Sequence, residues 1–376
     1  MKNKGKTHVI FCTDGIFPHA IGGMQRHSRL LIEELAKFSD IALTVIHPHK
    51  TTNIFDDSLH ITEIGFAAKK TKNQVDYFQN AYNYSKKVYS VLKKYPDAVI
   101  YSQGMSVWYG IKQVEERLII NPHGLEPYQV LTLKEKIITA PYRWVHNYLF
   151  KHSAKIVSLG GRLTDIFTTH LNIPEEKIIV LPNAANVPVL FERNFSRTPL
   201  QFLFVGRFAF NKGIQTLVDA IIELNEDGYS DKFRFALVGK GPLYEHLIHE
   251  YKISNAKFYG GAEDSALFNL YKESDVFILP TLFEGMPTVI LEAMGYGLPV
   301  IVTDTGATRQ LVDGSNGYII EKKNIASLKS AILKYSSLSA DERKKLSNSS
   351  YSKLKNNFSW QIVARQHYEL FKSMSN

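Results

Sequence analysis

The feature that most constrains the fold is a repeated alternation of short, β-branched runs with longer amphipathic stretches. In the first half of the chain, candidate strands lie at 8–13, 41–46, 97–102, 117–122, 154–159 and 177–182. Helical patterns lie between several of these runs, at 23–38, 73–95 and 161–171. Because helices commonly connect neighbouring parallel strands, the alternation predicts a parallel sheet with helices on both faces.

The alternation stops at residues 183–199, which lack clear periodicity and end in turn-forming residues, and it then starts again. The second set of candidate strands lies at 201–206, 233–239, 257–261, 275–280 and 299–304. We therefore predict an α/β protein with two Rossmann-like, doubly wound domains, residues 1–190 and 191–356. Residues 357–376 are amphipathic and are expected to form a helix that packs back toward the first domain.

Composition restricts the class of protein further. The 376 residues suffice for two cores, and a hydrophobic content of 44% is typical of globular proteins. The single cysteine, Cys12, excludes a disulfide within the chain and a cysteine-based metal cluster. The sequence has no apolar run near the ~18 residues of a membrane span, and the apolar piece after its basic start is too short for a signal peptide. A cytoplasmic protein is therefore expected.

The positive charge is concentrated in the first half of the chain. Residues 1–185 hold 23 Lys and Arg against 16 Asp and Glu, a net charge of +7 out of the +9 of the whole chain. Such a surplus is compatible with an anionic partner, such as a phosphate-bearing substrate or a membrane surface. On charge alone, an ordinary solvated lysine-rich surface is the preferred explanation. The base-stacking and groove-reading signatures of nucleic-acid binding are not visible in the sequence.

Ligands of open parallel sheets bind beyond the carboxyl ends of the strands, where loops lead into helices. In a protein of two such domains, these edges can face each other across a cleft. In the first domain, Gly22 and Gly23 precede a predicted helix, and paired glycines let a backbone approach an anion closely. His123 follows another predicted strand, within the segment NPHG. A glycine turn and a structural histidine are the competing interpretations.

Four loops of the second domain carry candidate binding residues. Arg207 and Lys212 lie in the loop VGRFAFNKGI, and two cations at a strand end would suit a diphosphate. Gly239 and Gly241 form a glycine turn in VGKGP, and Gly260 lies in a similar turn in FYGG. Both glycine patterns are weak by themselves, but their backbone groups could hold a nucleoside.

The most informative stretch is residues 275–306, which is strongly apolar yet carries Glu284 and Glu292 with seven residues between them. Glu284 follows a predicted strand, and Pro287 suits the first turn of a helix that would contain Glu292. A buried carboxylate is costly unless it accepts hydrogen bonds, and sugar hydroxyls would donate them. Backbone or arginine partners within the protein are the alternative. The sequence contains no D-x-D motif, so no acidic metal site is predicted.

With these segments in hand, the chain resembles the retaining glycosyltransferases of the GT-B fold, in the large bacterial group related to glycogen and sucrose synthases. Residues 283–320 are similar to the family's Glu–seven residues–Glu signature and its continuation. The segments GGMQRH, NPHG, VGRFAFNKGI and VGKGP match other family loops in the same order. One departure is PNAAN at 182–186, where the family often has Pro-Asn-Gly-x-Asp.

The resemblance implies a role for each candidate residue. Glu284 would contact hydroxyls of the donor sugar, in a pocket lined by the backbone of Gly285 and Met286. Glu292 would accept hydrogen bonds from the ribose, and the base would lie near Gly239, Gly241 and Gly260. Arg207 and Lys212 would hold the diphosphate, Gly22 and Gly23 would approach it from the other domain, and His123 would lie near the reacting sugar.

The implied reaction transfers a sugar from a nucleotide-diphosphate donor, UDP- or GDP-linked, to an acceptor hydroxyl, with retention of anomeric configuration and without a cofactor or metal. The acceptor would be a sugar or a lipid-linked sugar, in the synthesis of a surface polysaccharide or glycolipid. Segments 77–95 and 141–155 mix aromatic residues with cations, and such a face could contact the inner face of an anionic membrane. Helices with an apolar side toward the core and a lysine-rich side toward solvent are the alternative, which the pattern favours slightly. A nucleotide-sugar epimerase, a sugar phosphorylase and a non-catalytic binding protein of the same fold are the competing functions.

Overall fold

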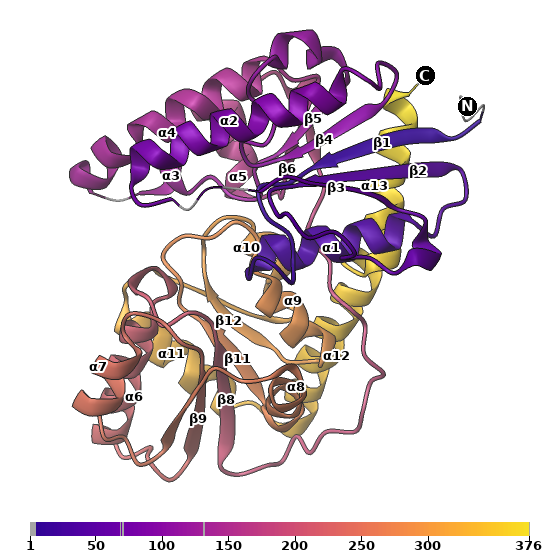
Figure 1. Ribbon diagram of the computed structural model, residues 1–376. Coiled ribbons are helices and arrows are strands. Elements are labelled where there is room, and N and C mark those ends of the chain that lie inside the picture. Colours follow the sequence, from indigo (N-terminus) through magenta and orange to yellow (C-terminus); the bar gives the residue numbers. More distant parts are fainter. Residues whose placement is uncertain (1–4, 68, 70, 131, 376) are drawn as a thin grey trace. The chain divides into compact units, whose positions relative to one another are not determined.

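The computed structural model describes residues 5–67, 69, 71–130 and 132–375 and divides the chain into two compact units (Figure 1). The N-terminal unit comprises Met1–Asn183 and Trp360–Asn376, and the C-terminal unit comprises Ala184–Ser359. Residues 184–190 and 357–359 therefore lie in the C-terminal unit. The reason is local pairing: the Ala185 amide donates to the Phe358 carbonyl at 3.0 Å, and Ala185 forms an isolated parallel bridge with Ser359.

The N-terminal unit is built on a seven-stranded parallel sheet with the order β3-β2-β1-β4-β5-β6-β7. Its strands are β1 Thr7–Cys12, β2 Ile41–His47, β3 Thr62–Gly65, β4 Val99–Gln103, β5 Leu118–Asn121, β6 Lys155–Ser158 and β7 Ile178–Val180. The six strands predicted from the sequence are confirmed. The prediction missed β3, a four-residue edge strand with no fully buried residue, because so short and exposed a segment carries little hydrophobic pattern.

Helices cover both faces of this sheet (Figure 1). They are α1 Gly23–Leu35, α2 Gln74–Leu92, α3 Glu126–Gln129, α4 Leu133–Lys151, α5 Arg162–Asp165 and α13 Trp360–Met374. The stretch predicted as one helix at 161–171 is α5 followed by the π-helix Ile166–His170. Helices α2 and α4 lie on one face, and α1 and α13 lie on the other. This arrangement follows from the strand order, since connections that move in opposite directions along a sheet pass over opposite faces.

Helix α13 is integrated into the N-terminal unit by aromatic packing and a side-chain hydrogen bond. Phe371 packs edge-on against Phe11 of β1, with ring centroids 5.8 Å apart. Tyr368 stacks on Phe38 at 4.4 Å, and its hydroxyl donates to Asp40 at 2.8 Å. The amphipathic pattern of the last residues thus reflects an apolar face that is buried against β1 and α1.

The C-terminal unit is built on a six-stranded parallel sheet with the order β10-β9-β8-β11-β12-β13. The strands are β8 Leu200–Val205, β9 Phe233–Val238, β10 Ala256–Gly260, β11 Val276–Leu279, β12 Val300–Thr303 and β13 Gly317–Ile320. The five predicted strands are confirmed, and β13 is an addition at the edge. Its helices are α6 Ile214–Glu226, α7 Tyr244–Glu250, α8 Asp264–Glu273, α9 Thr288–Gly295, α10 Thr308–Leu311, α11 Ile325–Ser336 and α12 Ala340–Asn357.

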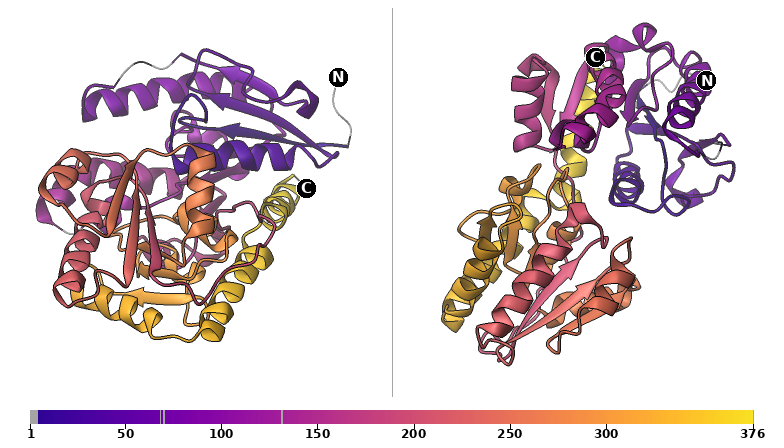
Figure 2. Two further views of the ribbon diagram at one scale, coloured as in Figure 1. Left: turned by 90° about the horizontal axis from the view of Figure 1, so that it is seen from below. Right: turned by 90° about the vertical axis from the view of Figure 1, so that its left-hand side faces the viewer.

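Two helix pairs cover the second sheet: α6 packs with α11, and α9 packs with α12 (Figures 1 and 2). Both units are therefore doubly wound α/β domains, as the alternation predicted. Among the helices of the described residues, none combines the length and the apolar character needed to cross a bilayer.

The segment that enters the C-terminal unit is irregular, but Arg193 anchors it. The Arg193 guanidinium donates to the carbonyl oxygens of Tyr271, Ser274 and Tyr296, which lie at the ends of α8 and α9. The guanidinium carbon of Arg193 lies 4.7 Å from the centroid of the Phe191 ring. The last carbonyls of a helix have no partner within that helix, so one arginine satisfies two helix ends.

We expect Arg193→Met to lower the free energy of unfolding of the C-terminal unit by about 3 kcal/mol, because three carbonyls lose a charged donor. Urea denaturation of the purified variant measures the effect. Lys252→Met, which removes an exposed cation from the same unit, is the matched control and should change stability by less than ~0.5 kcal/mol. Equal stability of the two variants would contradict the anchoring role.

Candidate active site

A short contact between two candidate residues joins the loops after β8 and β11. The Lys212 ammonium donates to Glu284 Oε1 at 2.5 Å, and the Lys212 and Glu284 side chains are only 25% and 11% exposed. The Thr281 hydroxyl donates to the same carboxylate oxygen at 3.0 Å. The structure therefore brings together a cation and an acid that are 72 residues apart in the sequence.

The close approach of these two loops depends on Gly213, which follows Lys212. Its backbone is left-handed, with φ of +68°, and a Cβ at this position would overlap the carbonyl oxygen of Pro280. The amide of Leu282 also donates to the carbonyl of Asn211 at 2.8 Å. Glycine is required here because only a residue without a side chain allows both the backbone conformation and the contact.

Arg207 lies at the carboxyl end of β8, in the same loop as Lys212, and its side chain is exposed. Within the described part of the chain, its guanidinium has no hydrogen-bonding or ion-pair partner. An arginine with five unused donors at a strand end can bind a phosphate oxygen with two parallel hydrogen bonds. Lys212 differs, since a protein carboxylate already holds its ammonium.

The glycine turns of the second sheet pack against the loop that carries Arg207. The Phe208 amide donates to the Lys240 carbonyl at 3.0 Å, and the Gly239 amide donates to the Gly260 carbonyl at 2.6 Å. A Cβ at Gly241 would overlap the backbone carbonyl of Phe208. These glycines are thus explained by loop packing, which places three strand-end loops side by side at one edge of the sheet.

Gly285 and Met286 lead into α9. The Gly285 carbonyl accepts from the Ala307 amide at 2.9 Å, and Met286 is buried. The sequence placed Pro287 in the first turn of the helix, but it is the residue before the helix, with an extended ψ of 115°. The difference moves the helix start by one residue, and the unpaired amides of the first turn begin at Thr288.

Glu292 lies on α9 and has a partner within the protein. The Tyr271 hydroxyl donates to Glu292 Oε2 at 3.0 Å, and the Tyr271 ring stacks on Tyr296 with centroids 5.4 Å apart. Burial raises the pKa of Tyr271 well above its usual value, which keeps the hydroxyl protonated as a donor. A group of the protein, the Tyr271 hydroxyl, therefore supplies one of the hydrogen bonds that this carboxylate accepts.

Two variants separate a structural role of Glu292 from the ribose binding that the family resemblance implies. We expect Glu292→Gln to weaken nucleotide binding about tenfold, because a neutral amide is a poorer acceptor for two hydroxyls. Tyr271→Phe should lower stability by about 1 kcal/mol and leave nucleotide affinity within about twofold. Isothermal titration with UDP measures both affinities. If Glu292→Gln binds UDP as tightly as the wild type, the acid is structural.

The candidates of the N-terminal unit gather around α1. Gly22 precedes the helix with an extended backbone, φ of 167°, and Gly23 is its first residue. His27 of the same helix meets His123, with ring centroids 5.9 Å apart, and also packs on Trp360 at 5.0 Å. The structure therefore places the paired glycines and His123 at the same carboxyl edge of the first sheet.

His123 adopts a left-handed backbone, with φ of +58°, and its amide donates to Asn121 Oδ1 at 2.8 Å. Both ring nitrogens are buried and, among the described residues, accept or donate no hydrogen bond. Burial lowers the pKa of His123 to about 3, so the ring is neutral at pH 7. An unpaired polar ring at a strand end costs free energy unless a ligand or water pairs with it.

Asp14 was missed as a candidate. It follows β1, its side chain is exposed, and it approaches Gly104, whose backbone is left-handed with φ of +57°. A Cβ at Gly104 would collide with the Asp14 carboxylate. Its position directly after the predicted strand at 8–13 was the available signal. Across the described residues, histidine, cysteine and acidic side chains form no group of three or more that could hold a metal ion.

Two family models and a curated relative match this chain. The family model "Glycosyltransferase Family 4" matches residues 21–187, and the model "Glycosyl transferases group 1" matches residues 199–337. The chain is 28% identical over 267 residues to the Escherichia coli UDP-Gal:α-D-GlcNAc-diphosphoundecaprenol α-1,3-galactosyltransferase, covering 66% of this chain and 68% of that protein.

Solved structures show the same fold. Sucrose-phosphate synthase of Thermosynechococcus elongatus aligns with a TM-score of 0.79 at 18% identity, over 98% of this chain and 99% of that one. Anabaena HepE, solved in complex with UDP-glucose, aligns with a TM-score of 0.69 at 14% identity, over 97% of this chain and 99% of that one. With two matching family models in sequence order and two doubly wound parallel sheets, the chain belongs to the glycosyltransferases of the GT-B fold.

Proposed function

We propose that this glycosyltransferase transfers a hexose from a UDP-sugar to a hydroxyl of a saccharide acceptor, with retention of configuration. The pairing of Lys212 with Glu284 at the carboxyl edge of the second sheet, in the same region as the exposed Arg207, carries the proposal. This edge supplies cations for a diphosphate and a carboxylate for sugar hydroxyls within adjoining loops. The bacterial galactosyltransferase uses a UDP-sugar by its name, and HepE was solved with UDP-glucose, which supports uridine in the donor.

In the proposed mechanism, the bond between the anomeric carbon and the diphosphate breaks first. Arg207 and Lys212 stabilise the negative charge that grows on the departing diphosphate, and because they are already in place they stabilise the transition state more than the ground state. The acceptor hydroxyl attacks the short-lived oxocarbenium-like sugar from the face that the diphosphate leaves. A phosphate oxygen takes the acceptor proton. No divalent ion is needed if the two cations neutralise the diphosphate.

Glu284 and His123 would orient the sugar. The Glu284 carboxylate accepts from Lys212 and Thr281 through one oxygen, and sugar hydroxyls would donate to the carboxylate as well. His123 stays neutral because of burial, so it would accept or donate a hydrogen bond without adding a charge. Lys212 and Thr281 hold the Glu284 carboxylate before the donor binds, which lowers the entropic cost of orienting the sugar.

The acceptor in this proposal is a lipid-linked saccharide of a surface polysaccharide or glycolipid, reached at the inner face of an anionic membrane. The first turns of α4 support membrane contact, because Leu133, Ile137 and Ile138 are 74%, 67% and 50% exposed. Lys134 and Lys136 lie between them in the sequence. Exposed apolar side chains flanked by cations are typical of helices that rest on acidic lipids. Co-sedimentation with vesicles containing phosphatidylglycerol should occur for the wild type and decrease for Leu133→Ser/Ile137→Ser.

The function is tested by incubating the protein with UDP-, GDP- and ADP-sugars and following thermal stability, which rises with any ligand that binds the native state. The best donor is then combined with lipid-linked saccharide acceptors, and proton NMR of the product gives the anomeric configuration. Donor incubated alone distinguishes an epimerase, which would isomerise it, and added phosphate distinguishes a phosphorylase. Inversion of configuration, or activity that chelation abolishes and Mn²⁺ restores, would contradict the proposed mechanism.

A further inference from the structure

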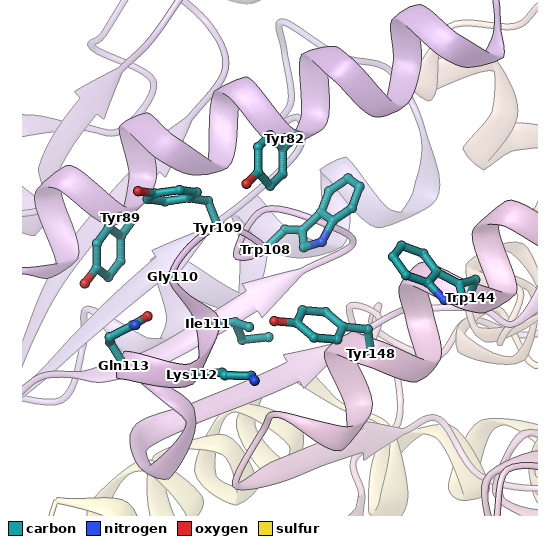
Figure 3. Close-up of a pocket in the computed structure, with 10 residues that line it drawn as sticks. All are labelled: Tyr82, Tyr89, Trp108, Tyr109, Gly110, Ile111, Lys112, Gln113, Trp144 and Tyr148. Carbon is teal, nitrogen blue, oxygen red and sulfur yellow. The ribbon is translucent and has the colours of Figure 1, made fainter.

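A pocket of about 520 Å³ lies in the N-terminal unit, between α2, the loop after β4, and α4 (Figure 3). No residue of the candidate active site lines it. Six of its ten lining residues are aromatic: Tyr82, Tyr89, Trp108, Tyr109, Trp144 and Tyr148. The aromatic residues of 77–95 and 141–155 are evident in the sequence. That the loop after β4 completes one pocket with them was not predicted.

The pocket lies away from the edge of the sheet where the reaction is expected. Helix α2 begins after the carboxyl end of β3 and runs back to the amino end of β4. Tyr82 and Tyr89 lie 8 and 15 residues beyond its first residue, Gln74, so they are ~12 Å and ~22 Å along the helix from that edge. Gly110 and Ile111 belong to the part of the loop that returns toward β5. The pocket therefore lies away from the carboxyl edge of the sheet, whereas His123 lies at that edge, after the end of β5.

Four of the six rings that line the pocket pack against one another. Tyr82 packs edge-on against Trp108 at 5.1 Å and against Tyr109 at 5.8 Å, and Tyr89 packs edge-on against Tyr109 at 5.5 Å. Gly110 is left-handed, with φ of +70°, and a Cβ there would lie 2.6 Å from the Tyr89 ring. These contacts order the site before any ligand binds, which lowers the entropic cost of binding.

Backbone hydrogen bonding orders the loop further. The Tyr109 amide donates to the hydroxyl of Ser85, a buried residue of α2, at 3.0 Å. The Lys86 ammonium lies 4.9 Å from the centroid of the Tyr82 ring and 5.6 Å from that of Tyr109. The loop is thus attached to α2 by a partly buried hydrogen bond and by a lysine that lies over Tyr109.

Polar groups on these rings are available to a ligand. Among the described residues, the hydroxyls of Tyr82, Tyr89, Tyr109 and Tyr148 have no hydrogen-bonding partner, and Figure 3 shows the Tyr148 hydroxyl directed toward the other lining residues. Lys112 and Gln113 line the same pocket and are exposed. The lining therefore combines flat apolar faces with hydroxyl, amide and ammonium groups.

A pyranose has the matching chemistry, because its axial C–H groups form an apolar face and its hydroxyls lie around the rim. Such a ring can stack on an indole or phenol while its hydroxyls pair with side chains around the pocket. A hydrocarbon chain fits worse, since covering the tyrosine hydroxyls without pairing them costs free energy.

We propose that this pocket is a saccharide-binding site outside the reaction centre, which holds a sugar unit of the glycan that the enzyme extends. The identification of the bound sugar as part of the acceptor rests on the proposed function, whereas sugar binding by the pocket does not. A second contact on the same glycan raises the affinity for acceptors that are long enough to reach it. Single-sugar affinity on the order of 1 mM is expected for such an open site.

The three tryptophans of the chain allow a direct test. In ¹⁵N-labelled protein, the indole N–H signals of Trp108 and Trp144 should shift saturably when methyl α-galactoside, methyl α-N-acetylglucosaminide, maltose or lactose is added. The signal of buried Trp360 should not move, which supplies an internal control. No donor is present, so the result does not depend on transferase activity. The proposal is overturned if none of the four sugars shifts Trp108 or Trp144, or if geranyl phosphate shifts them and the sugars do not.

Trp144→Ala should abolish the sugar-dependent shift of Trp108, and since Trp144 is 68% exposed the variant should fold. Val75→Ala, an exposed position on α2, is the matched control and should bind like the wild type. With active enzyme, Trp144→Ala should raise KM for a long acceptor at least threefold and leave hydrolysis of the donor unchanged. Unchanged sugar binding in Trp144→Ala would refute the site, whereas sugar binding without any transfer would refute only the proposed function.

Discussion

Replacing Lys212 with alanine is expected to lower the rate of sugar transfer on the order of 100-fold while the protein remains folded. The loss corresponds to about 3 kcal/mol of transition-state stabilisation, the usual effect of removing one preorganised group that faces developing charge. Lys212 also holds Glu284, so the variant disturbs the carboxylate that would orient the sugar. The measurement is kcat with saturating donor and acceptor, together with a thermal melt.

Two further variants make this result specific. Lys272→Ala removes an exposed cation of the same unit from α8 and should leave transfer unchanged. Lys212→Arg keeps the charge and should restore part of the rate. Arg207→Ala, which removes the exposed cation of the same loop, should reduce transfer to a similar extent, with a larger effect on KM for the donor. Transfer by Lys212→Ala within a few fold of wild type would eliminate the diphosphate assignment.

Lowering the pH from 7 to 5 is expected to destabilise the N-terminal unit strongly. Burial lowers the pKa of His123 to about 3 and that of His367 to about 4, and it also lowers the pKa of His27 well below 6.5. An unfolded histidine titrates near 6.5, so below that pH the unfolded chain binds protons that the folded chain excludes. The contribution of these neutral rings to the free energy of unfolding is therefore complete above pH 6.5 and falls as the pH decreases. Each buried histidine lowers it by about 1.4 kcal/mol per pH unit, and the three together lower it by about 4 kcal/mol per pH unit.

Tryptophan fluorescence reports this unit, because all three tryptophans belong to it. Urea denaturation at several pH values between 7 and 5 gives the slope. His367→Gln removes one titrating group and should reduce the slope by about 1.4 kcal/mol per pH unit. His249→Gln, at a position in the other unit that is 80% exposed, should leave it unchanged. A wild-type stability that stays constant from pH 7 to pH 5.5 would show that these rings are not excluded from protonation.

The predicted architecture followed from features that are local in the sequence. Apolar runs such as 41–46 and 233–239 are long and buried enough to be recognised without tertiary information. The two strands that were missed, β3 and β13, are four-residue edge strands. A hydrophobic pattern of only four residues is too short to be distinguished from that of a loop. Pro287 was placed one residue too far into its helix, an error typical of element boundaries.

The candidate site was predictable only as a set of strand-end loops. Arg207, Lys212 and Glu284 could be proposed because each follows a recognisable strand, and parallel strands bring such loops to one edge. That Lys212 contacts Glu284, and that Tyr271 rather than a ligand donates one hydrogen bond to Glu292, depends on side-chain packing between distant segments. Local patterns contain no information on such pairs.

The sequence alone thus determined the two doubly wound sheets and the family, because periodicity and ordered motifs are properties of neighbouring residues. Tertiary structure alone decided the partners of each charged group, the burial of His27, His123 and His367, and the aromatic pocket beside Trp108. These features join residues from separate elements, so they exist only when the close packing of strands, helices and loops brings those residues within a few ångströms of one another.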